Sequence, residues 1–519
     1  MIINNTVYLY VTPEKYANDA YDIVNLFYCG AVKRGAVGAV IQDDDGDVKR
    51  GAVGAIQQNG ICPDGSDAVR IDAREDFCKI DYSYIEFSNR VDETVDINFS
   101  GGAAAYEIKI ALYRLLKKRA RPEGGGAYLP WGALVGIRPI KMYLKMLEDG
   151  VGDGAAASFM LNKYDVPAET SALCARIAKK QQMALARYTP GLDYALYIGI
   201  PFCATKCAYC SFPSDAHNKA EIYAGQYIEA LRKELVFVAG RMNRAGRRLR
   251  CVYIGGGTPT ALNARELAAL FFAVREAYPD ARPDEITVEA GRADTIDARK
   301  LAVIGELRRI TPRLRICINP QTMNPETLQA IGRAHTPQDV VRSFRLARDS
   351  GFNDINMDII AGLPGEDLSK FKRTLEEITK LRPEGFTAHT LCIKRSSRLN
   401  EFYGEYAYPG AGATGAMQDA AGETAQALGM SPYYLYKQKN TIGNLANIGY
   451  SLEGFECEYN MHEMADDVDV AAVGAGAVSK FTDAATGRID RVFNVKNLLE
   501  YICRIDEMIR RKSDRLPAA

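Results

Sequence analysis

Six apolar, β-branched runs recur between residues 194 and 391, and each is followed by a stretch with helical patterning. The runs lie at residues 194–200, 251–254, 286–290, 314–319, 354–361 and 386–391. In the helical stretch 222–241, Tyr227, Leu231 and Leu235 recur at i, i+4 spacing, as in a helix that covers a sheet. The repetition predicts a parallel sheet, and since six units are too few for an eightfold barrel, we expect an open, partial (β/α)6 barrel of the α/β class.

The barrel region divides the chain into three predicted domains. The predicted domains are an N-terminal α+β region at 1–185, the core barrel at 186–395 and a C-terminal accessory domain at 396–519. The last domain is expected to end in a helix at about 494–511. The octapeptide VKRGAVGA occurs at 32–39 and again at 48–55. So short a repeat favours a Gly/Ala-rich loop insertion over a solenoid.

Charge and hydropathy exclude two classes of partner. The chain has 519 residues, with 65 Lys and Arg against 65 Asp and Glu, so it lacks the basic field that broad nucleic-acid binding requires. It has no run of about 18 apolar residues that would span a membrane. The first residues, MIINNTVYLYVTPEK, lack the basic and apolar segments of a signal peptide. We therefore expect a cytoplasmic protein that binds no nucleic acid and has no membrane span.

Unusual polar residues stand where the predicted strands end. In parallel α/β barrels, the loops that follow the strands build the active site. A cysteine-rich loop follows the first run, and the segment GGGTPT at 255–260 follows the second. Glu289 ends the third run, Gln321 follows the fourth, Asp358 lies in the fifth and His389 lies near the end of the sixth. Together these features predict one site at the mouth of the barrel.

Three of the 12 cysteines, Cys203, Cys207 and Cys210, lie in the short segment YIGIPFCATKCAYCSF. The spacing C-x3-C-x2-C lets three thiolates hold three corners of a [4Fe–4S] cluster and leaves the fourth iron without a protein ligand. The amine and carboxylate of an amino acid chelate such an iron, and S-adenosylmethionine carries both groups beside an electron-accepting sulfonium. The other nine cysteines are scattered singly and are expected to be reduced packing residues.

The cysteine segment resembles the radical S-adenosylmethionine superfamily, in which an aromatic residue precedes the last cysteine, as Tyr209 does here. The resemblance implies that one electron from the cluster cleaves bound S-adenosylmethionine to a 5′-deoxyadenosyl radical. Two further segments resemble a narrower group within the superfamily, the oxygen-independent coproporphyrinogen III oxidases and the related haem chaperones. They are NPQTMNPETLQAIGRAHT at 319–336 and NMDIIAGLPGE at 356–366.

Within this group the chain looks most like the HemZ-type coproporphyrinogen dehydrogenase branch. The segments that carry this resemblance are LPWGALVGIRPIK at 129–141, VEAGRADTI at 288–296, HTLCIKRSSRL at 389–399 and PYYLYKQKNTIGN at 432–444. Two positions depart from the well-established dehydrogenases. Gly199 replaces a histidine, and Phe212 replaces a fourth cysteine that the haem chaperones also lack.

The resemblance implies cofactor contacts for nine residues besides the cysteines. They are Tyr197 and Tyr209 beside the cofactor, Gly256, Gly257 and Thr258 at its amino-acid end, and Glu289, Gln321, Arg333 and Asp358 at its carboxylate and ribose. An arginine suits a carboxylate because its fork binds two oxygens. An aspartate suits a ribose because a carboxylate accepts hydrogen bonds from vicinal hydroxyls.

The implied reaction is the oxidative decarboxylation of coproporphyrinogen III to protoporphyrinogen IX in haem biosynthesis. The radical removes a hydrogen from a propionate β-carbon, and loss of CO2 and one electron leaves a vinyl group, so no residue need act as an acid or base. An electron donor and an acceptor are required, and the sequence identifies neither. The residues expected to bind the substrate carboxylates are Lys394, Arg395, Arg398, Lys437 and Lys439.

Two other functions are open to such a sequence. A haem chaperone would keep the cluster and bind haem without turnover. A plain iron–sulfur electron carrier is disfavoured, because that function has no use for GGGTPT, Glu289 and Asp358 around an open iron.

Overall fold

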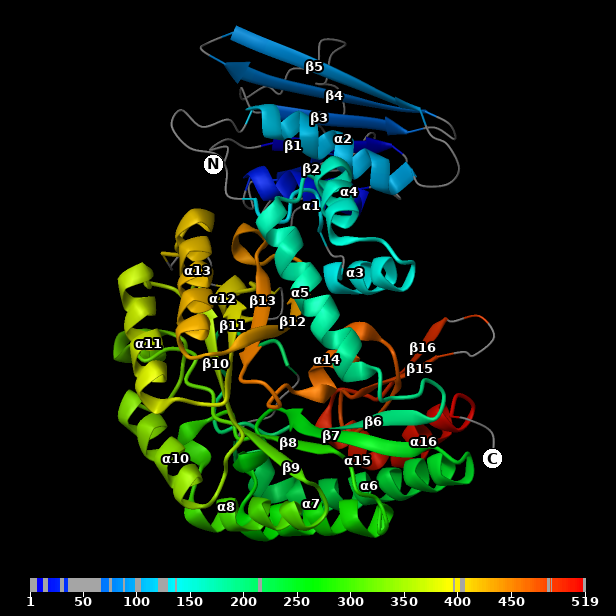
Figure 1. Cartoon of the computed structure of the whole chain (residues 1–519), viewed down its shortest axis with the longest axis vertical. Coiled ribbons are helices and arrows are strands. Elements are labelled where there is room, and N and C mark those ends of the chain that lie inside the picture. Colours follow the sequence, from blue (N-terminus) through cyan, green and yellow to red (C-terminus); the bar gives the residue numbers. More distant parts are fainter. Residues whose placement is uncertain are drawn as a thin grey trace, which may run out of the picture.

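The computed structural model describes residues 7–12, 17–28, 32–35, 67–73, 77–86, 89–98, 104–119, 129–135, 138–212, 217–394, 397–401, 407–482, 486 and 488–516. The molecule is elongated, with a small N-terminal sheet at one end and a large curved sheet at the other (Figure 1). None of the helices in these ranges is long and apolar enough to cross a membrane.

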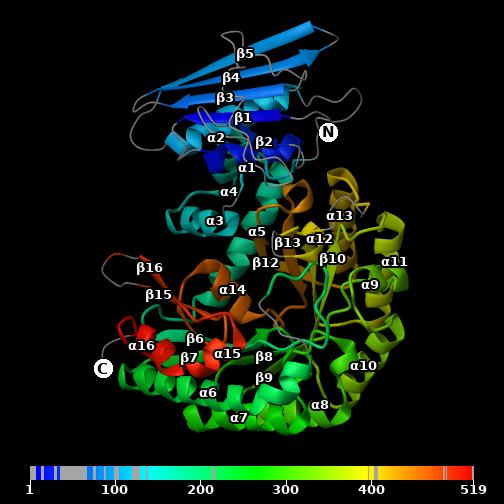
Figure 2. The same ribbon diagram turned by 180° about the vertical axis from the view of Figure 1, so that it is seen from behind.

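The N-terminal end is an α+β layer, as predicted. Its elements are β1 (Val7–Thr12), α1 (Ala17–Tyr28), β2 (Val32–Gly35), β3 (Asp67–Ala73), β4 (Phe77–Glu86), β5 (Asn89–Asn98) and α2 (Ala104–Arg119). The strand order is β2-β1-β3-β4-β5, with β1 parallel to β2 and β3 and the remaining pairs antiparallel. Helices α1 and α2 pack on one face of this sheet, and its edge strand β2 lies nearest the rest of the chain (Figure 2). Strand β2 begins the first VKRGAVGA copy, and the rest of both copies lies outside the described residues.

Three helices connect this layer to the large sheet: α3 (Pro139–Glu148), α4 (Asp153–Tyr164) and α5 (Ala168–Leu185). The segment 129–135 before them contributes to two hydrophobic cores. Trp131 and Leu134 belong to the large core that these helices share with the barrel. Ala133 and Val135 belong to the core of the N-terminal layer. The segment therefore joins the two parts through buried side chains.

The six predicted strand–helix units form the expected open, partial barrel. Its strands are β6 (Asp193–Ile200), β7 (Arg248–Gly256), β8 (Glu285–Glu289), β9 (Arg313–Cys317), β10 (Ile355–Ala361) and β11 (Gly385–Thr390). All six are parallel and adjacent in chain order. The helices on their outer side are α6 (His217–Arg244), α7 (Ala264–Ala277), α8 (Ala298–Gly305), α10 (Pro337–Asp349) and α11 (Leu368–Leu381) (Figure 1). The short helix α9 (Pro325–Ala330) lies in the connection between β9 and α10. The predicted helix at 222–241 lies within α6.

Side chains alternate between the two faces of these strands. On β6, Ile198 and Ile200 are fully buried in the core beneath the helices, whereas Tyr197 faces the inner side. On β8, Ile286 and Val288 belong to the same core, and Glu289 faces inward. The apolar residues of each strand thus anchor the outer helices and leave the polar residues free to line the interior.

The strands after residue 396 extend the same sheet to eleven strands. They are β12 (Ser431–Lys437) and β13 (Ala446–Ser451) beside β11, and β14 (Asp469–Val473), β15 (Val478–Thr482) and β16 (Ile489–Phe493) beside β6. The C-terminal helices are α12 (Arg398–Glu401), α13 (Ala411–Ala427), α14 (Glu458–Ala465), α15 (Leu498–Cys503) and α16 (Ile505–Ser513). The single helix predicted at 494–511 is two helices that meet at Arg504. The domain limits at 185 and 395 stay predictions.

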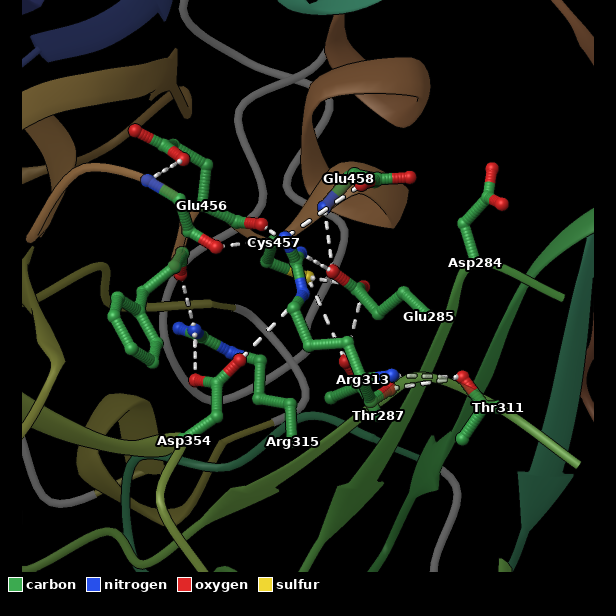
Figure 3. A network of polar contacts seen from close by, with 12 residues as sticks. Asp284, Glu285, Thr287, Thr311, Arg313, Arg315, Asp354, Glu456, Cys457 and Glu458 are labelled. Carbon is green, nitrogen blue, oxygen red and sulfur yellow. Dashed lines mark hydrogen bonds and ion pairs between the residues drawn. The ribbon is translucent and has the colours of Figure 1, made fainter. Parts of the chain in front are cut away.

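A network of buried charges closes the interior near the amino ends of the strands (Figure 3). Arg313 pairs with Glu285, and Arg315 Nη1 lies 2.9 Å from the Asp354 carboxylate. Arg315 also donates to the Phe455 carbonyl at 2.7 Å. The Glu458 amide at the start of α14 donates to Glu285 at 2.9 Å. A carboxylate stabilises the positive amino end of a helix, so the network holds α14 inside the sheet.

Candidate functional site

A cavity of about 610 Å³ lies on the inner side of the sheet, where the parallel strands end. The predicted cofactor and cluster residues all line it: Tyr197, Cys203, Cys207, Tyr209, Cys210, Gly256, Gly257, Thr258, Glu289, Gln321, Arg333 and Asp358. They come from five different strands and the loops that follow them, β6 to β10. Since the carboxyl ends of parallel strands meet at one edge, the fold gathers side chains that are far apart in sequence.

The cysteine loop is held by backbone hydrogen bonds to distant segments. The Ala208 amide donates to the Ile331 carbonyl at 2.9 Å, and the Ala208 carbonyl accepts from Leu399 at 3.0 Å. Burial raises the pKa of Cys210, and the thiolates of Cys207 and Cys203 add to the rise. The three cysteines are therefore close enough to influence one another, and thiols of this kind lose their protons when they bind metal.

The three cysteines suit a [4Fe–4S] cluster, in which each thiolate binds its own iron. Within the described ranges, no three His, Cys, Asp or Glu side chains lie close enough together to hold one metal ion. A [4Fe–4S] cluster bonds its thiolates to separate irons, so its ligands lie around a cavity wall instead of at one point. Cys203, Cys207 and Cys210 are placed in this way.

The glycines of GGGTPT serve a close approach between two backbones. The Gly257 amide donates to the Ile200 carbonyl at 2.7 Å, and a Cβ on Gly257 would lie 2.4 Å from the Phe202 carbonyl oxygen. Gly256 has a φ of +107°, which side chains disfavour. The expected reason for these glycines was approach to a ligand. The structure shows that they also let the loop pack on residues 200–202, just before Cys203.

Two carboxylates in the cavity have opposite pKa shifts. Burial raises the pKa of Glu289 to about 7, and the Asp358 carboxylate adds to the rise. Asn319 Nδ2 donates to Glu289 at 3.1 Å, and Tyr253 also donates to it. The His389 ring, 3.5 Å from Asp358, overcomes the opposing effect of burial and lowers the pKa of Asp358. Asp358 is therefore the carboxylate that stays ionised.

Gln321 and Arg333 complete the predicted cofactor wall. Gln321 has a φ of +66°, and its amide and carbonyl both bond β10. Its buried side-chain oxygen has no hydrogen-bond partner within the described ranges, so an acceptor remains available in the cavity. Arg333 donates to the carbonyls of Gly291 at 2.8 Å and Asn319 at 2.9 Å and to the Tyr209 hydroxyl at 3.0 Å.

The predicted substrate residues are placed less favourably. Lys437 donates to the Leu134 carbonyl at 2.8 Å and lies over the Trp131 ring, outside the cavity. Lys439 pairs with Asp22 of the N-terminal layer at 2.6 Å. Neither lysine lines the cavity, because the antiparallel β12 turns both toward the N-terminal part of the chain, and their role in substrate binding stays a prediction.

The other three predicted substrate residues belong to the segment after β11. Lys394 is half-buried and Arg398 is exposed, and neither lines the cavity. The adjoining Leu399 donates to Ala208, which places this segment beside the cysteine loop. Arg395 lies outside the described residues.

Other cavity-lining residues were not assigned from the sequence. They are Lys206, Tyr253, Arg292, Asn319, Tyr459, Asn460, Glu463, Met464 and Lys480. Arg292 and Asn319 lie within segments that carry the family resemblance, so proximity to Glu289 and Gln321 was a usable signal. The residues of α14 and β15 had no such signal, because their positions depend on how the C-terminal strands join the sheet.

Gly199 lies under the end of β14. A Cβ on Gly199 would touch the Tyr197 ring at 3.4 Å and the carbonyl oxygens of Val473 and Ala475 at 3.5 Å. These are ordinary van der Waals distances, so a Cβ fits at this position. Phe212, at the other departure, is 55% exposed and lies at the rim of the cavity.

Comparison with known proteins agrees with this geometry. Residues 197–378, which span five of the barrel strands, match the Radical SAM superfamily. HemZ of Bacillus subtilis, an oxygen-independent coproporphyrinogen-III oxidase-like protein, is 39% identical over 373 residues, which is 72% of this chain and 74% of HemZ. The chain therefore belongs to the radical SAM superfamily and, within it, to the oxygen-independent coproporphyrinogen-III oxidase-like family that includes HemZ. Membership implies a [4Fe–4S] cluster and S-adenosylmethionine.

The chain is also similar, at lower sequence identity, to two other proteins. The heme chaperone HemW of Escherichia coli is 29% identical over 303 residues, covering 58% of this chain and 74% of HemW. The structure of coproporphyrinogen III oxidase (HemN) from Escherichia coli superposes with a TM-score of 0.47 at 23% identity, covering 64% of this chain and 73% of HemN.

Proposed function

We propose that this protein carries out the oxygen-independent oxidative decarboxylation of coproporphyrinogen III to protoporphyrinogen IX. The observation that carries the proposal is the convergence of three cysteines and nine cofactor-type residues on one cavity in a chain of the HemZ family. When bound, the cluster and S-adenosylmethionine supply a carbon radical that removes hydrogen from a propionate side chain.

In this proposal the chain's own residues bind and orient the cluster and S-adenosylmethionine. Cys203, Cys207 and Cys210 hold the cluster, and Asp358 accepts hydrogen bonds from the ribose of the cofactor. Asp358 suits that role because His389 keeps it ionised. Arg333 lines the cavity, and since both its Nη atoms are bonded, it donates one hydrogen bond to the cofactor carboxylate from its unbonded Nε in this proposal. The aromatic rings of Tyr197 and Tyr459, stacked 6.1 Å apart, exclude water from one side of the cavity.

The substrate carboxylates are proposed to bind at the rim. Lys206 lies in the cysteine loop and is exposed at the cavity. Lys394 and Arg398 belong to the segment beside this loop. A set of cations at the mouth suits a substrate that carries four carboxylates, because each pairs with a solvent-accessible charge and none need be buried unpaired.

The second candidate function is haem binding without oxidase activity. It is favoured by the relationship to HemW and by Gly199 and Phe212, which replace the histidine and fourth cysteine of the dehydrogenases. An observation against it is that both ring nitrogens of the cavity residue His389 are engaged, by Asp358 at 3.5 Å and by the Tyr436 hydroxyl at 3.2 Å. An axial haem ligand requires a free ring nitrogen.

The test is anaerobic incubation of the reconstituted protein with dithionite, S-adenosylmethionine and coproporphyrinogen III. The proposed oxidase should form 5′-deoxyadenosine and CO2 in a ratio near one, with a vinyl product. A wild-type protein that cleaves the cofactor, releases no CO2 and forms a stable complex with added haem would instead establish the haem-binding function.

A further inference from the structure

The segment VEAGRADTI places a buried arginine against the cysteine loop. Arg292 follows β8, and its side chain is 2% exposed. Its Nη1 donates to the Thr205 carbonyl at 3.1 Å and to the Cys207 sulfur at 3.7 Å. One guanidinium nitrogen therefore contacts both the backbone of the cysteine loop and the sulfur of a proposed cluster ligand.

The rest of the guanidinium is anchored by a carboxylate. Arg292 Nε and Nη2 each lie 3.2 Å from one oxygen of Asp294, so the pair is two-pronged. Asp294 in turn faces Nδ1 of the buried His335 at 3.6 Å. Because a two-pronged pair fixes the plane of the guanidinium, Nη1 is directed away from Asp294 and toward Cys207.

Arg333, the other arginine beside the cysteine loop, has a different set of partners. It reaches the Tyr209 hydroxyl and two carbonyls of the cavity wall. Within the described ranges, Arg292 is the cation that donates a hydrogen bond to a cysteine sulfur of the loop. Of these two arginines, Arg292 donates to the Cys207 sulfur, whereas Arg333 donates to the hydroxyl of Tyr209.

We propose that Arg292 is a positioning residue that holds Cys207 in place and raises the reduction potential of the cluster. Reduction adds one negative charge to the cluster, which its sulfur ligands share. An N–H donor and a positive charge beside the Cys207 sulfur stabilise that reduced state more than the oxidised one. The inference rests on the cluster part of the proposed function and is independent of the identity of the substrate.

The experiment compares wild-type protein with Arg292→Gln and Arg292→Lys after anaerobic reconstitution. The midpoint potential is measured by dithionite titration followed by electron paramagnetic resonance, without S-adenosylmethionine or porphyrinogen. At a fixed solution potential, the glutamine variant should show a tenfold lower ratio of reduced to oxidised cluster, or about 59 mV for one electron. The lysine variant keeps the charge but loses the fork, so its midpoint should lie between the other two.

Arg342→Gln is the matched control. Arg342 also pairs with an aspartate, Asp339, but its side chain is 71% exposed on α10, so its loss should leave the midpoint unchanged. If Arg292→Gln takes up no iron, the test is the difference in midpoint potential between Arg292→Lys and the wild type.

Midpoints equal to the wild type in every Arg292 variant that loads a cluster would overturn the proposal. A wild-type protein that assembles no cluster would overturn it together with the proposed function. A lower midpoint potential in Arg292→Gln than in the wild type, together with a wild type that releases no CO2, would support the Arg292 proposal and contradict only the oxidase assignment.

Discussion

Arg138 Nη1 lies 2.6 Å from the Asp466 carboxylate, which ties the segment before α3 to the end of α14. Arg138 also donates to the Glu463 carbonyl at 3.2 Å. Asp466 accepts from Lys141 and from Lys480, each at 3.1 Å. Glu463 and Lys480 line the cavity. The N-terminal part of the chain therefore supports one wall of the candidate site through this set of ion pairs.

Replacing Asp466 with alanine should loosen α14. Lost hydrogen bonds to charged groups cost about 2 kcal/mol, which corresponds to roughly 30-fold faster amide exchange. Hydrogen–deuterium exchange of residues 458–465, followed by mass spectrometry, measures this. Asp149→Asn, which removes an exposed pair with Lys145, is the control and should change little. Equal exchange in the two variants would contradict the supporting role of Asp466.

Glu289→Gln should stabilise the cofactor-free protein at high pH. The pKa of Glu289 is raised to about 7 in the folded protein. The contribution of its protonated carboxyl to the free energy of unfolding is therefore fully present below pH 4.5, the ordinary pKa of a glutamate. That contribution is lost as the pH rises through 7, at roughly 1.4 kcal/mol per unit of pKa difference. The melting temperature of the variant should exceed that of the wild type at pH 8 and approach it at pH 4.5.

The surface substitution Glu306→Gln controls for the removal of a carboxylate, since Glu306 is 58% exposed. A pH-independent difference between Glu289→Gln and the wild type would show that the carboxyl of Glu289 is not buried beside Asp358 as described.

Lys512→Met should strongly destabilise the C-terminal helices. Lys512 Nζ lies 2.6 Å from Glu234 of α6, and both side chains are fully buried. Removing one partner leaves an uncompensated buried charge, which costs about 3–5 kcal/mol. Urea unfolding followed by circular dichroism measures the effect.

The double variant Glu234→Gln with Lys512→Met should recover part of the loss, because the remaining amide is neutral and keeps Tyr501 and Asn494 as partners. A double variant less stable than Lys512→Met alone would contradict this account. Glu507→Gln, on the same helix α16, should cost much less, because Glu507 is one third exposed and its pairs with Arg504 and Arg511 are accessible to solvent.

Cys207→Ala should abolish cluster assembly, because the proposed cluster has only three protein ligands. The measurement is iron and sulfide content per chain together with the visible absorption. Cys317→Ala is a closely matched control, since Cys317 lines the same cavity but lies on β9 away from the loop. Full iron content in Cys207→Ala, or loss of iron in Cys317→Ala, would show that the ligands are assigned incorrectly.

The barrel and the cofactor residues could be predicted from the sequence because their signals are local. An apolar run of four to eight residues identifies a strand, and parallel strands place their following loops at one edge. Three cysteines within one loop are close in space whatever the rest of the chain does. Glu289 and Gln321 were predictable for the same reason, since Glu289 ends β8 and Gln321 follows β9, while Asp358 lies within β10.

Only the tertiary structure decided which distant segments complete the site. Arg138 and Asp466 are separated by 328 positions, and no periodicity or motif encodes such a pair. Lys437 appeared suited to a substrate carboxylate from its tyrosine-rich surroundings, yet β12 pairs antiparallel with β13 and directs it to Leu134. Side-chain direction at an edge strand follows from pairing and register, and these depend on the free energy of packing the whole chain, which residue types alone do not specify.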